Sequence, residues 1–279
     1  MRVFITSDPH LGVNNRGDRA VKEMASYLQK IGTSQDVLMI LGDLATCDFG
    51  VSQCLGYFSC FPGKKLAVAG NHDIWVYSEE GRDSNQRYQQ LGQLCRQKGF
   101  TLLDQESVIV DGIGFVGGIG WYDYSFRDLL DIPIEAYKIK VFPGEEEICW
   151  QDACLAKWES GDQEVVEQQL RHLQSQLDWL KTAQIIVGMH HAPTKSLLFH
   201  PRHLIPARWR FRNAFLGSTR FEELFAKYAS RITHVFCGHI HRHSSVIEQG
   251  IHYTSVGSTY KRKELITLES GKQLSKMIF

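Results

Sequence analysis

Five short apolar runs along the chain each end in a cluster of polar residues that can carry chemistry. The runs cover residues 3–7, 37–41, 66–69, 185–189 and 232–237. Runs of this length predict buried strands, and α/β sheets place their ligands in the loops at the carboxyl ends of such strands. The cluster Gly70-Asn71-His72-Asp73 is the centre of this pattern. We therefore expect chemistry at one edge of an α/β sheet.

Amphipathic segments between the runs predict helices. A helix from about Asp18, with Asp18 as its N-cap and Gly32 at its C-terminal end, would join the first two strands in a right-handed βαβ unit. That unit would place Asp8 and Asp43 at neighbouring strand ends. Further helices are predicted after Asp83, over about 162–182 and over 219–229.

Short strands separated by turn residues predict an antiparallel portion, so the sheets should be mixed. They lie at 101–103, 108–110 and 113–116, with a closing hairpin of 245–248 and 251–255. The segment from about 121 to 161 follows neither the helix nor the strand period, and we interpret it as an insertion over the site. Its many aromatic residues could form a stacking wall for a substrate, or they could pack on one another.

Composition bounds the class of protein. With 279 residues, 43% of them hydrophobic, the chain predicts one domain over 1–279. Lys plus Arg and Asp plus Glu both number 31, so no overall field attracts nucleic acid or an anionic membrane. Locally, Arg202, Arg208, Arg210 and Arg212 form a basic loop. This loop could bind a phosphate or a distal acidic group, remain solvated, or pair with the acidic insertion.

The cysteines and the N-terminus bear on location. Seven cysteines without a C-x-x-C pair predict reduced thiols in an intracellular protein. The first strand begins at Arg2-Val3 and no apolar run has the length of a membrane span. We expect a soluble, cytoplasmic protein.

All five clusters offer carboxylate, imidazole or carboxamide groups and none offers a thiolate, which favours a hard or borderline divalent metal. Residues i and i+2 at a strand end point to the same side, so Asp8 with His10, and His239 with His241, can each present two ligands. One such pair means little, because a lone histidine is more often a core or surface residue. Five clusters at five strand ends indicate a metal site.

The motifs D-x-H, G-D, G-N-H-D, H-x-x-P and G-H-x-H, in this order, resemble the calcineurin-like metallophosphoesterase superfamily. The resemblance runs from Asp8 to about Gly257. It implies a four-layer αββα sandwich with mixed sheets and a dinuclear metal site at the C-terminal ends of the strands. By position, one metal would be held by Asp8, His10, Asp43 and His241, and the other by Asp43, Asn71, His190 and His239. Asp43 would bridge the two metals.

The resemblance also implies hydrolysis of a small phosphodiester or phosphomonoester by attack of a metal-bridging hydroxide. The cofactors would be two divalent or mixed-valence ions of Mn, Fe, Zn, Ni or Co. Two divalent ions with two carboxylates leave a net charge of about +2, which suits a phosphate ester. His72 and Asp43 are the candidate catalytic residues. His72 could donate to a phosphoryl oxygen, protonate the leaving group or orient Asn71. Asp73 and Asp48 are candidates to orient its imidazole.

In the fourth cluster, His190 matches the superfamily's metal-binding histidine, so we expect His190 to bind metal. His191 would then lie behind it or face the substrate.

Departures from the pattern narrow the substrate class. Phosphoserine/threonine phosphatases of the superfamily carry Arg before G-N-H, where this chain has Ala69, and their G-D-x-x-D-R-G segment is absent after Gly42. Its DNA-repair nucleases have further domains after the catalytic core, whereas this sequence ends about 20 residues past Gly257. The pattern is most similar to small phosphodiesterases and phosphomonoesterases. The alternatives are a protein phosphatase or nuclease of the superfamily, or a metal-binding scaffold without turnover.

Overall fold

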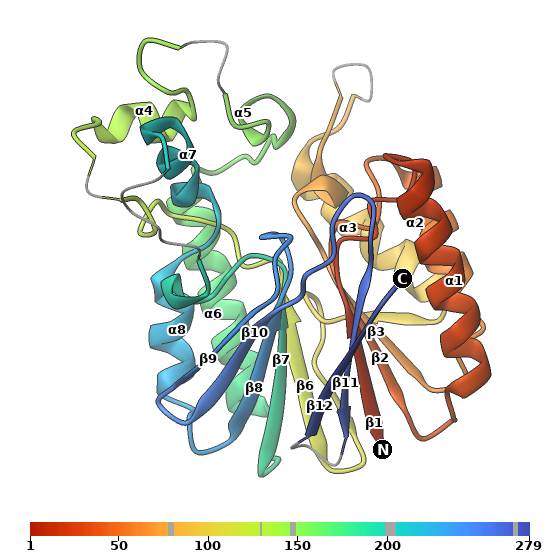
Figure 1. The fold of residues 1–279 in the computed structure, drawn as a ribbon. Coiled ribbons are helices and arrows are strands. Elements are labelled where there is room, and N and C mark those ends of the chain that lie inside the picture. The colour runs from red at the N-terminus through yellow and green to blue at the C-terminus, as the bar shows by residue number, and fades with distance from the viewer. Residues whose placement is uncertain (78–80, 129, 146–148, 199–204, 270–272) are drawn as a thin grey trace.

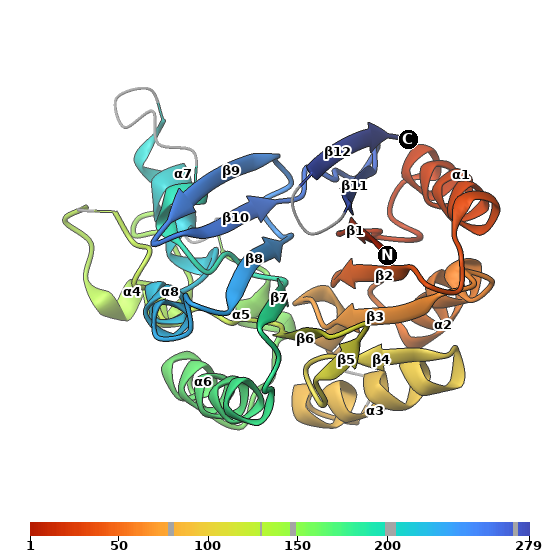
Figure 2. The same cartoon turned by 90° about the horizontal axis from the view of Figure 1, so that it is seen from below.

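Two six-stranded sheets pack face to face, with helices on the two outer faces (Figures 1 and 2). The computed structural model describes residues 1–77, 81–128, 130–145, 149–198, 205–269 and 273–279. The arrangement confirms the predicted four-layer αββα sandwich with mixed sheets.

The first sheet has the order β12-β11-β1-β2-β3-β4, in which β1 to β4 are parallel and β11 and β12 antiparallel to their neighbours. Its strands are β1 (Arg2–Thr6), β2 (Val37–Leu41), β3 (Lys64–Val68), β4 (Phe100–Leu102), β11 (Glu264–Glu269) and β12 (Gln273–Ile278). Helices α1 (Asn15–Ile31), α2 (Asp48–Phe58) and α3 (Ser84–Gln97) cover its outer face (Figure 2).

The second sheet has the order β5-β6-β7-β8-β10-β9, with β6, β7, β8 and β10 parallel and antiparallel edges. Its strands are β5 (Val108–Val110), β6 (Ile113–Gly118), β7 (Gln184–Met189), β8 (Ile232–Cys237), β9 (Ser244–Glu248) and β10 (Ile251–Ser255). Helices α6 (Asp162–Trp179) and α8 (Thr219–Ala226) cover its outer face (Figure 2). Three shorter helices, α4 (Ile134–Ile139), α5 (Asp152–Leu155) and α7 (Ala207–Arg212), gather beyond its upper end (Figure 1).

The core explains why the predicted strands are apolar without interruption. In β2, Val37, Met39 and Leu41 face the layer between the sheets, while Leu38 and Ile40 face the helices. Successive side chains of a strand point to opposite faces, so a strand in the middle of four layers must be apolar on both. The carboxyl ends of the parallel strands of both sheets therefore meet at one edge.

Two details of the first half differ from the sequence-based expectations. Helix α1 is capped by Asn14, whose side-chain oxygen accepts hydrogen bonds from the backbone of Arg16 and Gly17, while Asp18 accepts one from the Gly12 N–H at 2.9 Å. Strand β4 pairs in parallel with β3, so the antiparallel portion here is limited to β5 and β6.

Helix α2 and the hairpin of β11 and β12 were not predicted. Helix α2 contains two glycines and has a weak amphipathic pattern, and it therefore lacks the usual sequence signal of a helix. Among the described residues, no helix is long and apolar enough to cross a membrane.

Candidate metal centre and active site

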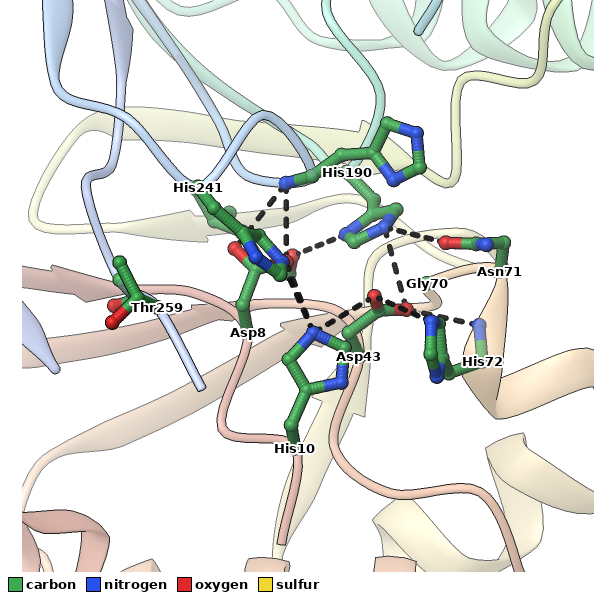
Figure 3. Close-up of polar contacts among 12 residues, drawn as sticks. Asp8, His10, Asp43, Gly70, Asn71, His72, His190, His241 and Thr259 are labelled. Atoms are coloured by element: carbon green, nitrogen blue, oxygen red, sulfur yellow. Dashed lines mark hydrogen bonds and ion pairs between the residues drawn. The ribbon is translucent and has the colours of Figure 1, made fainter. Parts of the chain in front are cut away.

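The five polar clusters meet where the two sheets face each other (Figure 3). Two groups of side chains present ligand atoms that lie within 4.8 Å of one another. One group is Asp8, His10, Asp43 and His241, and the other contains Asp43, His190 and His239. Asp43 belongs to both groups, as the resemblance implies. We call these residues, together with Asn71, the metal floor.

Five residues of the metal floor have a left-handed backbone. The φ angles are 51° at Asp8, 44° at His10, 55° at Asp43, 64° at His239 and 55° at His241. Asp and His are among the residues that tolerate this conformation best. The pairs Asp8 with His10 and His239 with His241 therefore converge through tight turns, and strand alternation, from which their convergence was predicted, is not the cause.

The environment of His190 fixes its proton. Its Nδ1 lies 2.9 Å from the carbonyl oxygen of Leu41, which can only accept, so Nδ1 carries the hydrogen. Burial lowers the pKa of His190, so the ring is neutral and Nε2 presents a lone pair. That lone pair faces the side-chain oxygen of Asn71 at 3.1 Å and a carboxylate oxygen of Asp43 at 3.3 Å.

The orientation of Asn71 is fixed by a buried carboxylate from α5. Asp152 accepts hydrogen bonds from the Asn71 amide (3.0 Å), the Trp75 and Trp150 indoles (2.6 Å each) and the Tyr122 hydroxyl (3.0 Å). Because the amide nitrogen is held by Asp152, the amide oxygen must point at His190. Two acceptors facing each other repel unless a cation lies between them. The residues therefore fit a bound metal ion.

The other group of ligands gives the same result. His10 Nε2 lies 3.1 Å from His241 Nε2 and 3.4 Å from a carboxylate oxygen of Asp43. Burial and the neighbouring Asp8 raise the pKa of Asp43 well above its usual value, and a divalent ion beside it would favour the ionised carboxylate. Within the described ranges, the buried Nε2 of His239 has no hydrogen-bond partner. Carboxylate, imidazole and carboxamide donors suit two divalent ions.

His72 lies beside the metal floor. Its backbone N–H donates to Asp43 at 2.9 Å, and its ring stacks on Trp75 with the centroids 3.7 Å apart. Burial, together with His190 and His241, lowers the pKa of His72 to about 3, so the imidazole is neutral.

The two carboxylates considered as partners of His72 are used elsewhere. Asp73 accepts from the backbone N–H groups of Leu44 and Gly70, and Asp48 pairs with Arg82 at 2.7 Å. His72 is therefore held by stacking on Trp75 and by the hydrogen bond from its backbone N–H to Asp43, and neither Asp73 nor Asp48 orients its ring.

His191 contacts the back of the metal floor. Its Nδ1 lies 2.9 Å from the Ile119 carbonyl, and its ring lies 4.2 Å from that of His239. The structure thus groups His190 with the other ligand atoms, and His191 packs behind His239.

A pocket of about 600 Å³ opens above the metal floor. Its sides consist of Trp150, Trp209, Arg212 and Tyr260, which we call the wall. The Tyr260 ring lies 4.7 Å from that of His10 and 4.9 Å from that of His241. The wall thus combines aromatic surface with one cation, Arg212, in the same pocket as the metal floor.

The predicted insertion has a mixed outcome. Five of its aromatic residues are buried, namely Trp121, Tyr122, Tyr124, Phe126 and Tyr137. All of these except Phe126 have ring contacts with one another or with Phe211 and Phe215. Trp150 instead lines the pocket. Packing of the aromatics on one another is thus confirmed for the buried residues, and a stacking wall for a substrate stays a prediction, with Trp150 as its candidate.

The arginines of the basic loop have different surroundings. Arg208 lies 3.9 Å from Glu145 and Arg210 lies 3.1 Å from Asp128, so these two pair with the acidic insertion. Arg212 lines the pocket, and Arg202 lies outside the described residues.

Sequence reasoning missed Asp152, Trp75 and Tyr260. Asp152 and Tyr260 lie outside the five clusters, and Trp75 follows the third cluster by two residues. The one sequence signal among these three residues was that Trp75 lies three positions after His72.

Comparisons with solved structures confirm the fold. Phosphopantetheinyl hydrolase (PptH) from Mycobacterium tuberculosis is similar with a TM-score of 0.70 and 18% identity, over 99% of this chain and 95% of that one. A dimetal phosphatase from Danio rerio has a TM-score of 0.55 and 12% identity, over 100% and 98% of the chains. GAP50, the anchor in the inner membrane complex of Plasmodium, has a TM-score of 0.53 and 8% identity, over 100% and 84%.

No curated protein matched the sequence significantly. The sequence model described as calcineurin-like phosphoesterase matches residues 1–243, which is most of the chain and includes every residue of the metal floor. The protein therefore belongs to the calcineurin-like phosphoesterase family and is a metallophosphoesterase.

Proposed function

We propose that the protein hydrolyses a small phosphomonoester or phosphodiester in the pocket above the metal floor. The observation that carries this proposal is the pair of ligand groups that share Asp43 at the bottom of an open pocket. Bound there, two divalent ions would supply charge for the phosphoryl oxygens and acidify a water for attack on phosphorus. The pocket would admit an ester of moderate size.

The protein's own residues would position the reacting groups. Asp43 would bridge both ligand groups and, through its bond to the His72 N–H, fix the loop that carries His72. His72 is neutral, and a neutral imidazole can donate one hydrogen bond. We therefore favour a role for His72 as donor to a phosphoryl oxygen over a role as general acid.

The relatives offer two kinds of function to compare. PptH is named a phosphopantetheinyl hydrolase, so a phosphopantetheine ester belongs among the substrates to test. GAP50 is named an anchor, so a scaffold function is the rival to test. The complete set of candidate ligands and the open pocket support an enzyme. All seven cysteines are free, and free thiols are typical of a reducing compartment. We therefore propose that the protein acts in the cytoplasm.

Hydrolysis assays would test the proposal. The purified protein, loaded with Mn²⁺, Ni²⁺, Zn²⁺ or Fe, would be given p-nitrophenyl phosphate, bis-p-nitrophenyl phosphate and a phosphopantetheine ester. We expect metal-dependent turnover, and the ratio of diester to monoester rates would identify the substrate class. Two bound metal equivalents without turnover of any ester would favour the scaffold.

A further inference from the structure

Arg212 differs from the other described arginines of its loop. It ends α7 and lines the same pocket as Asp43, Asn71 and His239, and of the described residues around that pocket it is the one with a permanent positive charge. No ion pair or hydrogen bond joins its side chain to another described residue, and its guanidinium lies 4.4 Å from the Trp209 ring centroid. Arg212 is therefore available to an anion.

The neighbouring acids explain why Arg212 stays available. Asp128 is occupied by Arg210 at 3.1 Å and by the Asn213 amide at 3.3 Å. Glu145 lies near Arg208. Among the described residues that line the pocket, the one acid is Asp43, which belongs to the metal floor. The side of the pocket near α7 thus keeps a positive charge that nothing described compensates.

The wall around Arg212 is held firmly. Asn213 to Phe215 continue directly from α7, and the buried Phe215 stacks on Trp150 at 5.5 Å. Trp150 is fixed by its bond to Asp152 and touches the ring of His239, with centroids 5.9 Å apart. Helix α7 stands beside α4, away from the strand ends that carry the metal floor (Figure 1). The pocket therefore has two cationic parts, the metal floor when loaded and Arg212, with aromatic surface in the same cavity.

We propose that Arg212 and Trp209 form a distal anion subsite, so that the substrate is a phosphoester whose leaving group carries a second anionic group, a phosphate or a carboxylate. This inference rests on the proposed function and names its substrate class. The planar guanidinium of Arg212 presents its N–H donors in a fork that suits both oxyanions, and the Trp209 ring lies against it. The part of the leaving group between the two anions would lie against Trp150 and Leu216.

Binding of ligands that cannot be cleaved tests this subsite independently of turnover. Isothermal titration calorimetry on the Mn²⁺-loaded protein would compare hexylphosphonate with hexane bisphosphonate, which has one phosphonate at each end. A carboxyalkylphosphonate of the same length and the butane and octane bisphosphonates complete the series. We expect the second anion to raise the affinity about 10- to 100-fold at the best length. A gain with the carboxylate would show that either anion is accepted, and a gain limited to the bisphosphonate would identify a phosphate.

Two variants assign the gain to Arg212. In Arg212→Gln, the affinity for the bisphosphonate should fall by most of that factor, while the affinity for hexylphosphonate falls less than about threefold. Arg208→Gln is the matched control and should keep the wild-type pattern. Thermal unfolding would confirm that both variants fold.

Two outcomes would overturn the subsite. Equal losses of both ligands in Arg212→Gln would place Arg212 at the phosphoryl group on the metals. No gain from a second anion at any length in the wild type would exclude a distal anion subsite. Failure to hydrolyse any ester would count against the proposed function and leave these binding results as they stand.

Discussion

The metal floor and the wall of the pocket are built differently. In the floor, Asp8 and His190 are 0% exposed, and their loops are tied to neighbouring strands by backbone hydrogen bonds. In the wall, Trp209 is 51% exposed and belongs to a helix of six residues. The floor would determine the reaction, and the wall would determine which esters enter. We expect that these two properties can be changed separately, except at Asp152, which bonds to both Asn71 and Trp150.

The largest expected effect is that of Asp43→Asn. This change removes the one carboxylate common to both ligand groups, and with it half of the floor's negative charge. Both metals and activity should be lost together. Loss of a residue that only hydrogen-bonds to a metal ligand costs about 10- to 100-fold in metal affinity or activity, and we expect a larger loss here. Metal content after dialysis, measured beside the rate, checks this. Two tightly bound metals in the variant would contradict the bridging role.

The adjacent histidines provide an internal comparison within the floor. His190→Ala should lose one of two metals, because Nε2 of His190 faces Asn71 and Asp43. His191→Ala should keep both, since its Nδ1 bonds to the Ile119 carbonyl. Elemental analysis of the two proteins measures the stoichiometry. The reverse pattern would mean that the assignment of the two residues must be exchanged.

His72→Ala separates two kinds of catalysis. If His72 donates to a phosphoryl oxygen, nitrophenyl and alkyl esters should slow by similar factors, because the stabilised charge is common to both. This is the result we expect from its neutral ring. If His72 protonates the leaving group, alkyl esters should lose more, by about 10²- to 10⁴-fold. The measurement is kcat/KM for both esters at fixed metal content.

Asp152→Asn should disrupt the hydrogen bonds that connect the metal floor to the wall. An amide cannot accept from all four donors as the carboxylate does, so Asn71 loses its fixed orientation. We expect metal affinity to fall about 10- to 100-fold at the site near Asn71. Trp150→Phe, which removes one donor and keeps Asp152, is the control. Metal titrations of both proteins decide, and an unchanged affinity in Asp152→Asn would show that Asn71 is oriented without it.

The sequence predicts those features of the structure that depend on residues close together in the chain. The strands that precede Asp8, Asp43 and His190 were predictable because apolar runs and the polar residues after them are adjacent in the chain. Asp152 was not, because it meets Asn71 across 81 residues. The pairing of Arg210 with Asp128, which leaves Arg212 available, spans 82 residues. Such long-range contacts depend on how the insertion packs, and the hydrophobic periodicity of the sequence does not predict that packing.

The left-handed turns of the metal floor have a thermodynamic consequence. A residue other than glycine in this conformation costs on the order of 1 kcal/mol or more, and five such residues lie together. The metal-free protein is therefore held above the energy that the same chain would have with relaxed turns. Metal binding would offset this cost, because the ligand atoms converge in this backbone geometry. We therefore expect metal loading to stabilise the folded protein, so that its resistance to proteolysis would increase with the supply of metal.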